Sequence, residues 1–181
     1  MDHKINDAFE IMEQTFSKFE QVLSALDDLG INYVIVGGLA VHHHGWERYT
    51  KDIDILVSQL GIQKMTESGA FVWEPSQSRV HIISMIHQPT KIKVDALRSG
   101  SISGFPDIMS VSRSERDRRI ASIEDLIAIK CLRGDPSDYG DIYRITKGSL
   151  KEGRMVDWDV VKSKVSDKIW QRIQSDVLKY L

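Results

Sequence analysis

The stretch VIVGGLAVHHHGWERYTKDIDILV, residues 34–57, contains two apolar runs, of which the first ends in a glycine pair and the second carries two aspartates. The β-branched composition of both runs predicts strands, and the segment between them suits a short helix that stops near Gly45. Because side chains alternate between the two faces of a strand, Asp52 and Asp54 are expected to point the same way. Their charges then repel each other unless a cation neutralises them.

The rest of the chain predicts further strands and several helices. Apolar residues recur at steps of three and four over residues 5–29, which is typical of one amphipathic helix or two in succession, ended by Gly30. Strands are expected at residues 31–36, 51–57, 70–74, 80–87 and 91–97, of which the last two form a hairpin. Helices are expected at residues 58–69, at 122–134 with Ser122 as N-cap and Gly134 as its end, and at 138–150, 156–165 and 167–181.

The predicted fold class is therefore α+β, with a small mixed β-sheet core flanked by helices and a helical C-terminal part. We expect an α/β core with its N-terminal helix over residues 1–110. A helical region over residues 111–181 is expected to pack on this core, so that the two form one compact unit. At 181 residues the chain is long enough to bury a proper core.

Composition excludes several classes of protein. A formal net charge of −2 argues against a strongly basic clamp for nucleic acids, although a local basic patch is compatible with it. The single cysteine, Cys131, rules out an internal disulfide and is expected to be a buried small hydrophobe. No apolar run approaches the roughly 18 residues that span a bilayer, and the N-terminal residues lack the apolar core of a signal peptide. These features favour a cytoplasmic protein without membrane contact.

A third carboxylate, Asp95, is expected to join the first two. In the strand predicted at 91–97, alternation places Asp95 on one face together with Lys93. If this strand lies beside the strand of Asp52 and Asp54, the three acids form one cluster. Such a cluster suits hard divalent cations such as Mg²⁺ or Mn²⁺, and it can hold one metal on a triphosphate and another on an attacking hydroxyl.

The glycine pair Gly37-Gly38 has a matching interpretation. A strand that turns straight into a helix exposes backbone N–H groups, and a phosphate can approach them when no Cβ stands in the way. Taken alone, a Gly-Gly pair is more often only a turn, and an Asp-x-Asp on a strand is more often a solvated face. Their order and spacing together favour an anion-binding corner beside a metal platform.

This order of motifs resembles the nucleotidyltransferase superfamily that includes DNA polymerase beta, and within it the small bacterial and archaeal proteins related to AbiE-type toxin nucleotidyltransferases. A second and less specific match is SIEDLIAIKCLRGDPSDYGDIYRI, residues 122–145, in which a helix with an embedded lysine precedes a D-x-x-D-I stretch. The residues of the first match are Gly37-Gly38, Ala40, His44-Gly45, Arg48, Thr50, Asp52 and Asp54.

The resemblance implies the transfer of an NMP from an NTP to a hydroxyl acceptor. Mg²⁺ or Mn²⁺ would be bound by Asp52 and Asp54, and the triphosphate would lie on Gly37 and Gly38. Asp95 would serve as a further metal ligand and would help to activate the acceptor hydroxyl. The acceptor stays open between RNA such as a tRNA end, a hydroxyl of a partner protein and a small molecule. The choice of NTP, the oligomeric state and a role within a toxin–antitoxin system stay open as well.

Three further residues are candidates for nucleotide binding. Arg48 and Thr50 lie just ahead of the acidic strand, within reach of a triphosphate, and the alternative for Arg48 is an ordinary salt bridge to Asp52 or Asp54. Lys130 falls within an apolar helical stretch, where a lysine either extends to water or reaches a phosphate, as the resemblance implies.

Other polar clusters have simpler interpretations. Asp138 and Asp141 share a helix face and are expected to pair with Arg133 or Arg144. Residues 42–44 are three consecutive histidines that point in different directions on a helix, so they are not expected to form a metal site; His44-Gly45 is expected to end the helix and pack the turn. The Arg113–Arg119 stretch is interpreted as a solvated loop, with a basic edge for an RNA acceptor as the alternative.

Two other classes of function compete with the transferase. A non-catalytic binding module would keep the fold and pair with a partner, for instance as an antitoxin-like protein, but it would have no reason to keep three acids close together. A glycosyltransferase also holds a metal and a nucleotide diphosphate with an Asp-x-Asp motif. The shortness of the chain and the early Gly-Gly turn argue against that class.

Overall fold

The computed structural model describes residues 2–46, 49–79, 81–100 and 105–180. Within them the sheet has five strands, β1 (Tyr33–Val36), β2 (Asp52–Val57), β3 (Phe71–Trp73), β4 (Ile82–His87) and β5 (Lys93–Arg98), in the order β1-β2-β5-β4-β3. Strands β2 and β5 run parallel, and every other neighbouring pair is antiparallel. This mixed sheet with flanking helices confirms the predicted α+β class. Each strand begins one or two residues later than the sequence predicts.

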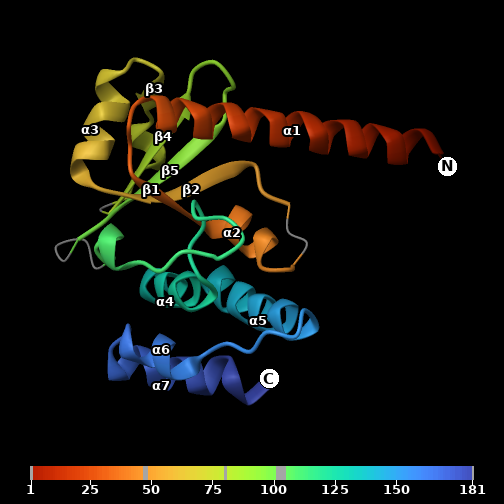
Figure 1. Ribbon diagram of the computed structural model, residues 1–181, viewed down its shortest axis with the longest axis vertical. Coiled ribbons are helices and arrows are strands. Elements are labelled where there is room, and N and C mark those ends of the chain that lie inside the picture. The colour runs from red at the N-terminus through yellow and green to blue at the C-terminus, as the bar shows by residue number, and fades with distance from the viewer. Residues whose placement is uncertain (1, 47–48, 80, 101–104, 181) are drawn as a thin grey trace.

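The sheet lies between two layers of helices (Figure 1). One layer contains α1 (Asp2–Asp28) and α3 (Gln59–Glu67), and the other contains α2 (Gly37–His43), α4 (Ile123–Arg133) and α5 (Pro136–Lys151). Beyond α4 and α5 lie α6 (Trp158–Ser163) and α7 (Asp167–Asp176). Both faces of β2 are covered, so its C-terminal part is apolar on both sides, and Ile53, Ile55, Leu56 and Val57 are fully buried.

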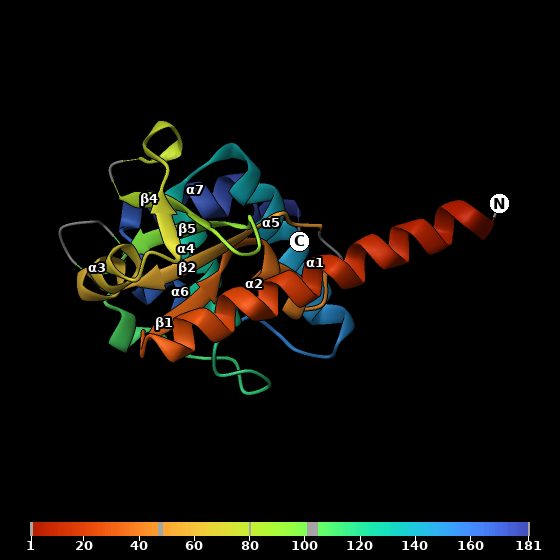
Figure 2. The same ribbon diagram turned by 90° about the horizontal axis from the view of Figure 1, so that it is seen from above.

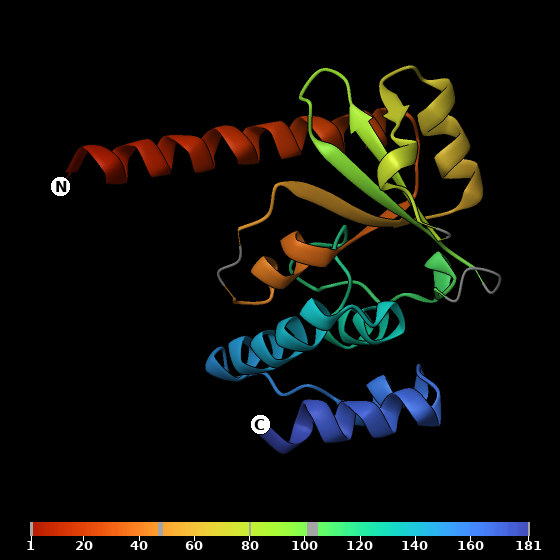
Figure 3. The same cartoon turned by 180° about the vertical axis from the view of Figure 1, so that it is seen from behind.

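Helix α1 is a single helix, and only its C-terminal part packs on the body. Phe19, Val22 and Leu26 are buried against the core, whereas the N-terminal half extends past the sheet (Figures 2 and 3). Gly30 ends it with a φ of +59°, which agrees with the C-cap predicted there. No helix in the described part of the chain is long and apolar enough to cross a bilayer; α1 has the length but is rich in charged residues.

The caps of α4 and α5 follow from local sequence. The hydroxyl of Ser122 accepts a hydrogen bond from the backbone N–H of Asp125, and Gly134 ends α4 in the left-handed region, as predicted. Helix α5 begins two residues before its predicted start because Pro136 suits the first helical turn and Asp135 and Asp138 form a capping box. Because Gly134 ends the helix, Arg133 is the last residue of α4, and it lies close to the sheet.

The arginine-rich stretch at residues 113–119 is held against β1. The backbone N–H of Ile35 donates to the carbonyl of Arg119 at 2.7 Å, and the N–H of Ala121 donates to the carbonyl of Ile35 at 3.1 Å. A guanidinium N–H of Arg113 donates to the carbonyl of Tyr33 at 2.7 Å. The stretch thus covers the β1 edge of the sheet, and so it is more than the solvated loop that was predicted.

Candidate active site

The three predicted aspartates stand on neighbouring strands. In the parallel register of β2 and β5, Asp54 lies opposite Asp95, and Asp52 lies opposite Lys93. Partners in register point to the same face of a sheet, and so do residues two apart in one strand. The structure thus brings Asp52, Asp54 and Asp95 together on the face that α2 and α4 cover.

Lys93 lies between two of the carboxylates. Its Nζ is 2.8 Å from Oδ2 of Asp95 and 3.8 Å from Oδ2 of Asp52. Strand alternation predicted Lys93 on the same face as Asp95, but no function was predicted for it. The signal was its position two residues before an aspartate in a predicted strand.

Asp54 is the most buried of the three acids. Its side chain is 10% exposed, against 14% for Asp95 and 38% for Asp52. Burial raises the pKa of Asp54 to about 6, and the negative charges of Asp52 and Asp95 contribute to the rise. A guanidinium N–H of Arg133 lies 3.5 Å from Oδ1 of Asp54 and offsets part of it. No local pattern in the sequence indicates this contact, because Arg133 comes from the end of a distant helix.

Asp95 is also held from its other side. The hydroxyl of Ser84 donates to Oδ1 of Asp95 at 2.6 Å, and Ser84 is opposite Asp95 in the antiparallel register of β4 and β5. One carboxylate oxygen of Asp95 thus accepts from a hydroxyl and the other pairs with Lys93. The hairpin was predicted from the sequence, but Ser84 was missed because its contact depends on the register.

The glycine pair allows β2 and the segment before it to approach α2. Gly37 has a φ of +67°, and a Cβ on it would overlap the carboxylate of Asp54. A Cβ on Gly38 would lie 2.7 Å from both Cβ and Oγ1 of Thr50. The space left by the missing side chains is therefore filled by Asp54 and Thr50, where the sequence interpretation assigned it to a phosphate. Contact between a phosphate and the backbone N–H groups of this turn stays a prediction.

The other candidates for nucleotide binding are placed differently. Thr50 lies in the cluster, where its hydroxyl donates to Oδ1 of Asp52 at 2.8 Å. Arg48 lies outside the described residues. Lys130 does not lie at an open surface: its ammonium is buried between Asp138 at 3.1 Å and Asp141 at 2.8 Å.

Asp138 and Asp141, which pair with Lys130, also contact arginines, as predicted. Arg133 lies 3.6 Å from Asp138, and Arg144 lies 3.4 Å from Asp141. These contacts were predicted from helical spacing, but the central position of Lys130 between the two acids was not. The cluster links α4 to α5 beneath the candidate site.

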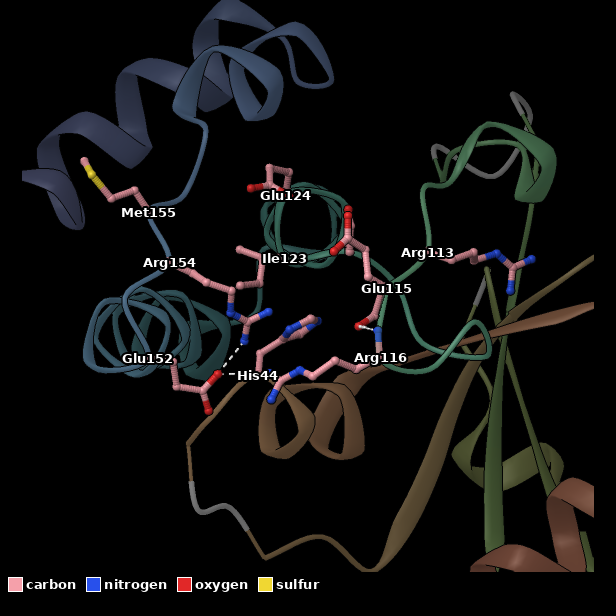
Figure 4. A pocket seen from close by; sticks show the side chains of 11 residues that line it. His44, Arg113, Glu115, Arg116, Ile123, Glu124, Glu152, Arg154 and Met155 are labelled. Atoms are coloured by element: carbon pink, nitrogen blue, oxygen red, sulfur yellow. Dashed lines mark hydrogen bonds and ion pairs between the residues drawn. The ribbon is translucent and has the colours of Figure 1, made fainter.

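A pocket of about 780 Å³ lies elsewhere, between the end of α2, the 113–116 segment and the residues after α5 (Figure 4). Within its lining, Arg116 and Arg154 both pair with Glu152, at 2.9 and 2.6 Å. His44 also lines the pocket; it is buried, and its Nε2 donates to the carbonyl of Ala121 at 2.8 Å. None of the three aspartates lines this pocket. His44-Gly45 ends α2 and packs the turn, as predicted.

A divalent cation fits the chemistry of the aspartate cluster but not its present arrangement. Among the described residues, no group of three or more His, Cys, Asp or Glu side chains is arranged to hold a metal ion as it stands. The ammonium of Lys93 lies between Asp52 and Asp95 and offsets part of their negative charge. Carboxylate oxygens are the ligands that Mg²⁺ and Mn²⁺ prefer. The chemistry of the donor set, three carboxylates on one face of the sheet, therefore suits such an ion.

Comparison with known proteins identifies similar structures but no similar sequence. No protein-family model and no curated protein matches the sequence. The solution structure of the antibiotic-resistance factor ANT(2'')-Ia is similar, with a TM-score of 0.56 and 14% identity over 91% of this chain and 94% of that chain. The crystal structure of ANT(2'')-Ia in complex with adenylyl-2''-tobramycin gives a TM-score of 0.55 and 14% identity over 94% of this chain and 99% of that chain.

A third structure, of an antigenic nucleotidyltransferase-like protein from Paracoccidioides brasiliensis, gives a TM-score of 0.48 and 17% identity over 90% of each chain. At an identity of 14%, the likeness to ANT(2'')-Ia shows the fold alone. The chain therefore shares the α+β fold of ANT(2'')-Ia.

Proposed function

We propose that this chain is a metal-dependent nucleotidyltransferase that transfers an NMP from an NTP to a hydroxyl acceptor. The observation that carries the proposal is the register of β2 and β5, which sets Asp54 opposite Asp95 and puts Asp52 on the same face. Three carboxylates in a partly buried cluster repel one another, and the raised pKa of Asp54 reflects that repulsion together with burial. A bound divalent cation would relieve that repulsion further than Lys93 and Arg133 do.

The reaction would join the acceptor oxygen to the α-phosphorus of the NTP. The bond from the α-phosphorus to the bridging oxygen breaks, and pyrophosphate leaves with its electron pair. Mg²⁺ or Mn²⁺ held by Asp52, Asp54 and Asp95 would supply charge neutralisation for the triphosphate and for the attacking oxygen. Catalysis would depend mainly on positioning and electrostatics.

Asp95 is proposed to accept the proton of the acceptor hydroxyl. Ser84 fixes the carboxylate through Oδ1, which leaves Oδ2 for the hydroxyl when Lys93 moves away. Thr50 is proposed to orient Asp52 through its hydrogen bond to Oδ1. The triphosphate is proposed to lie along the turn at Gly37 and Gly38.

Arg48 and Lys130 are the other two proposed nucleotide-binding residues, and their proposed roles differ. Arg48 precedes Thr50 by two residues, and a guanidinium near the triphosphate would bind phosphate oxygens in a bidentate manner. Lys130 is proposed to act at a distance: its contacts are with Asp138 and Asp141, and its charge lowers the pKa of Asp54 slightly.

A small-molecule hydroxyl is the acceptor that we favour. The support is the structure of ANT(2'')-Ia in complex with adenylyl-2''-tobramycin, together with the near-complete overlap of the two chains. A tRNA end or a partner protein, as in an AbiE-like toxin–antitoxin system, is the alternative.

The test is to incubate the protein with Mg²⁺, each α-labelled NTP and a cell extract separated into small molecules, RNA and protein. We expect label in the small-molecule fraction, and at least a hundredfold less with Asp54→Asn, which removes a charge from the cluster. Asp28→Asn, the same change at an exposed position at the end of α1, should label like the wild type. Label in the RNA or protein fraction would instead identify the acceptor as an RNA or a protein. Absence of both labelling and metal-dependent NTP binding would instead indicate a non-catalytic module.

A further inference from the structure

Lys93 differs from the other cations near the aspartates in what it contacts. Arg133 has its closest contact with Asp135, at 2.9 Å from Nε, and touches the cluster only through Asp54 at 3.5 Å. Lys93 has both of its described carboxylate contacts inside the cluster, with Asp95 and Asp52. It therefore holds the position between the two outer carboxylates.

The Lys93 side chain is able to turn away from that position toward water. It is 27% exposed, and it is attached to the strand by a long unbranched stem with freely rotating bonds. Water solvates the ammonium once it leaves, which offsets part of the cost of separating these partly buried ion pairs. Its carboxylate partners are held independently, Asp95 by Ser84 and Asp52 by Thr50.

We propose that Lys93 is a built-in competitor of the divalent cation, whose ammonium bridges Asp52 and Asp95 in the metal-free protein and must turn away before a metal ion binds there. This inference rests on the proposed function, because it concerns the same carboxylates. In the metal-free state Lys93 reduces the repulsion within the cluster. In exchange it lowers the affinity for the metal, since each ion has to displace a positive charge that is already paired.

Binding of Mn²⁺ alone, without nucleotide, tests the proposal directly. The signal of free Mn²⁺ in electron paramagnetic resonance gives the dissociation constant for the wild type, Lys93→Met and Lys93→Arg. Methionine keeps the length of the side chain and removes its charge, so Lys93→Met should bind Mn²⁺ at least tenfold more tightly than the wild type. Lys93→Arg keeps the charge and should stay within threefold of it.

Lys51→Met is the matched control. Lys51 is exposed, directly precedes the first residue of β2, and has its Nζ 6.0 Å from the centroid of the Tyr49 ring. This variant therefore loses the same charge one residue away from Asp52. It should change the Mn²⁺ affinity by less than threefold. Thermal unfolding of each variant shows that it is folded.

The possible outcomes separate this inference from the proposed function. Equal Mn²⁺ affinity of the wild type and Lys93→Met would overturn the competition and leave the metal site intact. Weaker binding by folded Lys93→Met would also overturn it, because Lys93 would then be holding the carboxylates in a binding arrangement. Failure of every variant, the wild type included, to bind Mn²⁺ at millimolar concentrations would remove the metal from the proposed function, and the inference with it.

Discussion

The backbone of Gly37 lies against the carboxylate of Asp54, with no room for a side chain between them. Gly37→Ala would place a methyl group where that carboxylate is and would also put alanine at a φ of +67°. The backbone conformation alone costs about 1–2 kcal/mol for a residue with a Cβ. We expect Gly37→Ala to lower the free energy of unfolding by about 3 kcal/mol or more, as measured by urea titration.

Gly69→Ala separates the two causes of that loss. Gly69 has a similar φ of +72°, but a Cβ on it would meet nothing within 4 Å. Replacing Gly69 by alanine should lower the free energy of unfolding only by the cost of the backbone conformation, about 1–2 kcal/mol. Equal costs for the two variants would show that Gly37 is required for its backbone conformation and not for its closeness to Asp54.

Thr50 is predicted to set the orientation of Asp52. Thr50→Val keeps the shape of the side chain but removes the donor to Oδ1 of Asp52. Without this hydrogen bond the carboxylate of Asp52 is free to rotate out of position, so the rate of NMP transfer should fall about tenfold or more, with Thr50→Ser close to the wild type. Because Asp52 is partly exposed, the free energy of unfolding should hardly change. A loss confined to NTP affinity, with an unchanged rate at saturation, would assign Thr50 to the nucleotide instead.

Lys130 is predicted to contribute to stability more than to nucleotide binding. Lys130→Met would leave the buried carboxylates of Asp138 and Asp141 without their central ammonium. Removing one partner of a buried ion pair typically costs about 3–5 kcal/mol. We expect a loss of that order in urea titration, partly recovered when Asp141→Asn is added. Unchanged stability together with weaker NTP binding would instead support the phosphate contact that the family resemblance implies.

The strands and their faces were predictable because that information is local. Alternation in KIKVDAL and DIDILV assigns Asp52, Asp54 and Asp95 to polar faces without any knowledge of the sheet. The same rule already put Lys93 beside Asp95, but an alternating pattern does not tell which neighbouring strand a charge meets. The contact with Asp52 depends on the parallel register of β2 and β5, which is a tertiary property.

The contacts that side chains of α4 make with other elements were not predictable from local sequence. Lys130 lies in an apolar stretch of α4, and helical spacing indicated arginine partners for Asp138 and Asp141, but not the packing of α4 against α5 that encloses Lys130. Arg133 reaches Asp54 only because α4 ends beside the sheet. For the glycine pair, the missing Cβ indicated a close approach without indicating which group makes it.

The pH dependence of stability is predicted to include a marked contribution from His44. Its Nε2 donates to the carbonyl of Ala121, and its Nδ1 is buried without a hydrogen-bond partner among the described residues. A second proton would have to sit on Nδ1, and burial accordingly lowers the pKa of His44 to about 4. In the unfolded chain the pKa of a histidine is about 6.5.

The sign follows from which state binds the proton. Above pH 6.5 His44 is neutral in both states, so its full contribution is present; between pH 6.5 and 4 only the unfolded chain takes up the proton, and stability falls. By pH 5 the loss is about 2 kcal/mol. The Asp54 carboxyl, whose pKa is raised to about 6, acts in the opposite direction, because the folded state binds its proton first.

His44→Gln isolates the histidine, since Asp54 titrates alike in the variant and the wild type. Urea titrations at pH 8 and pH 5 should show the variant less stable than the wild type at pH 8, because glutamine packs less well in the buried site. On going to pH 5, the wild type should lose about 2 kcal/mol more than the variant. His42→Gln, at an exposed neighbouring position, should keep the pH dependence of the wild type. If His44→Gln lost as much stability between the two pH values as the wild type, the imidazole of His44 would have to be protonated in the folded state, with Nδ1 donating to a group that moves toward it.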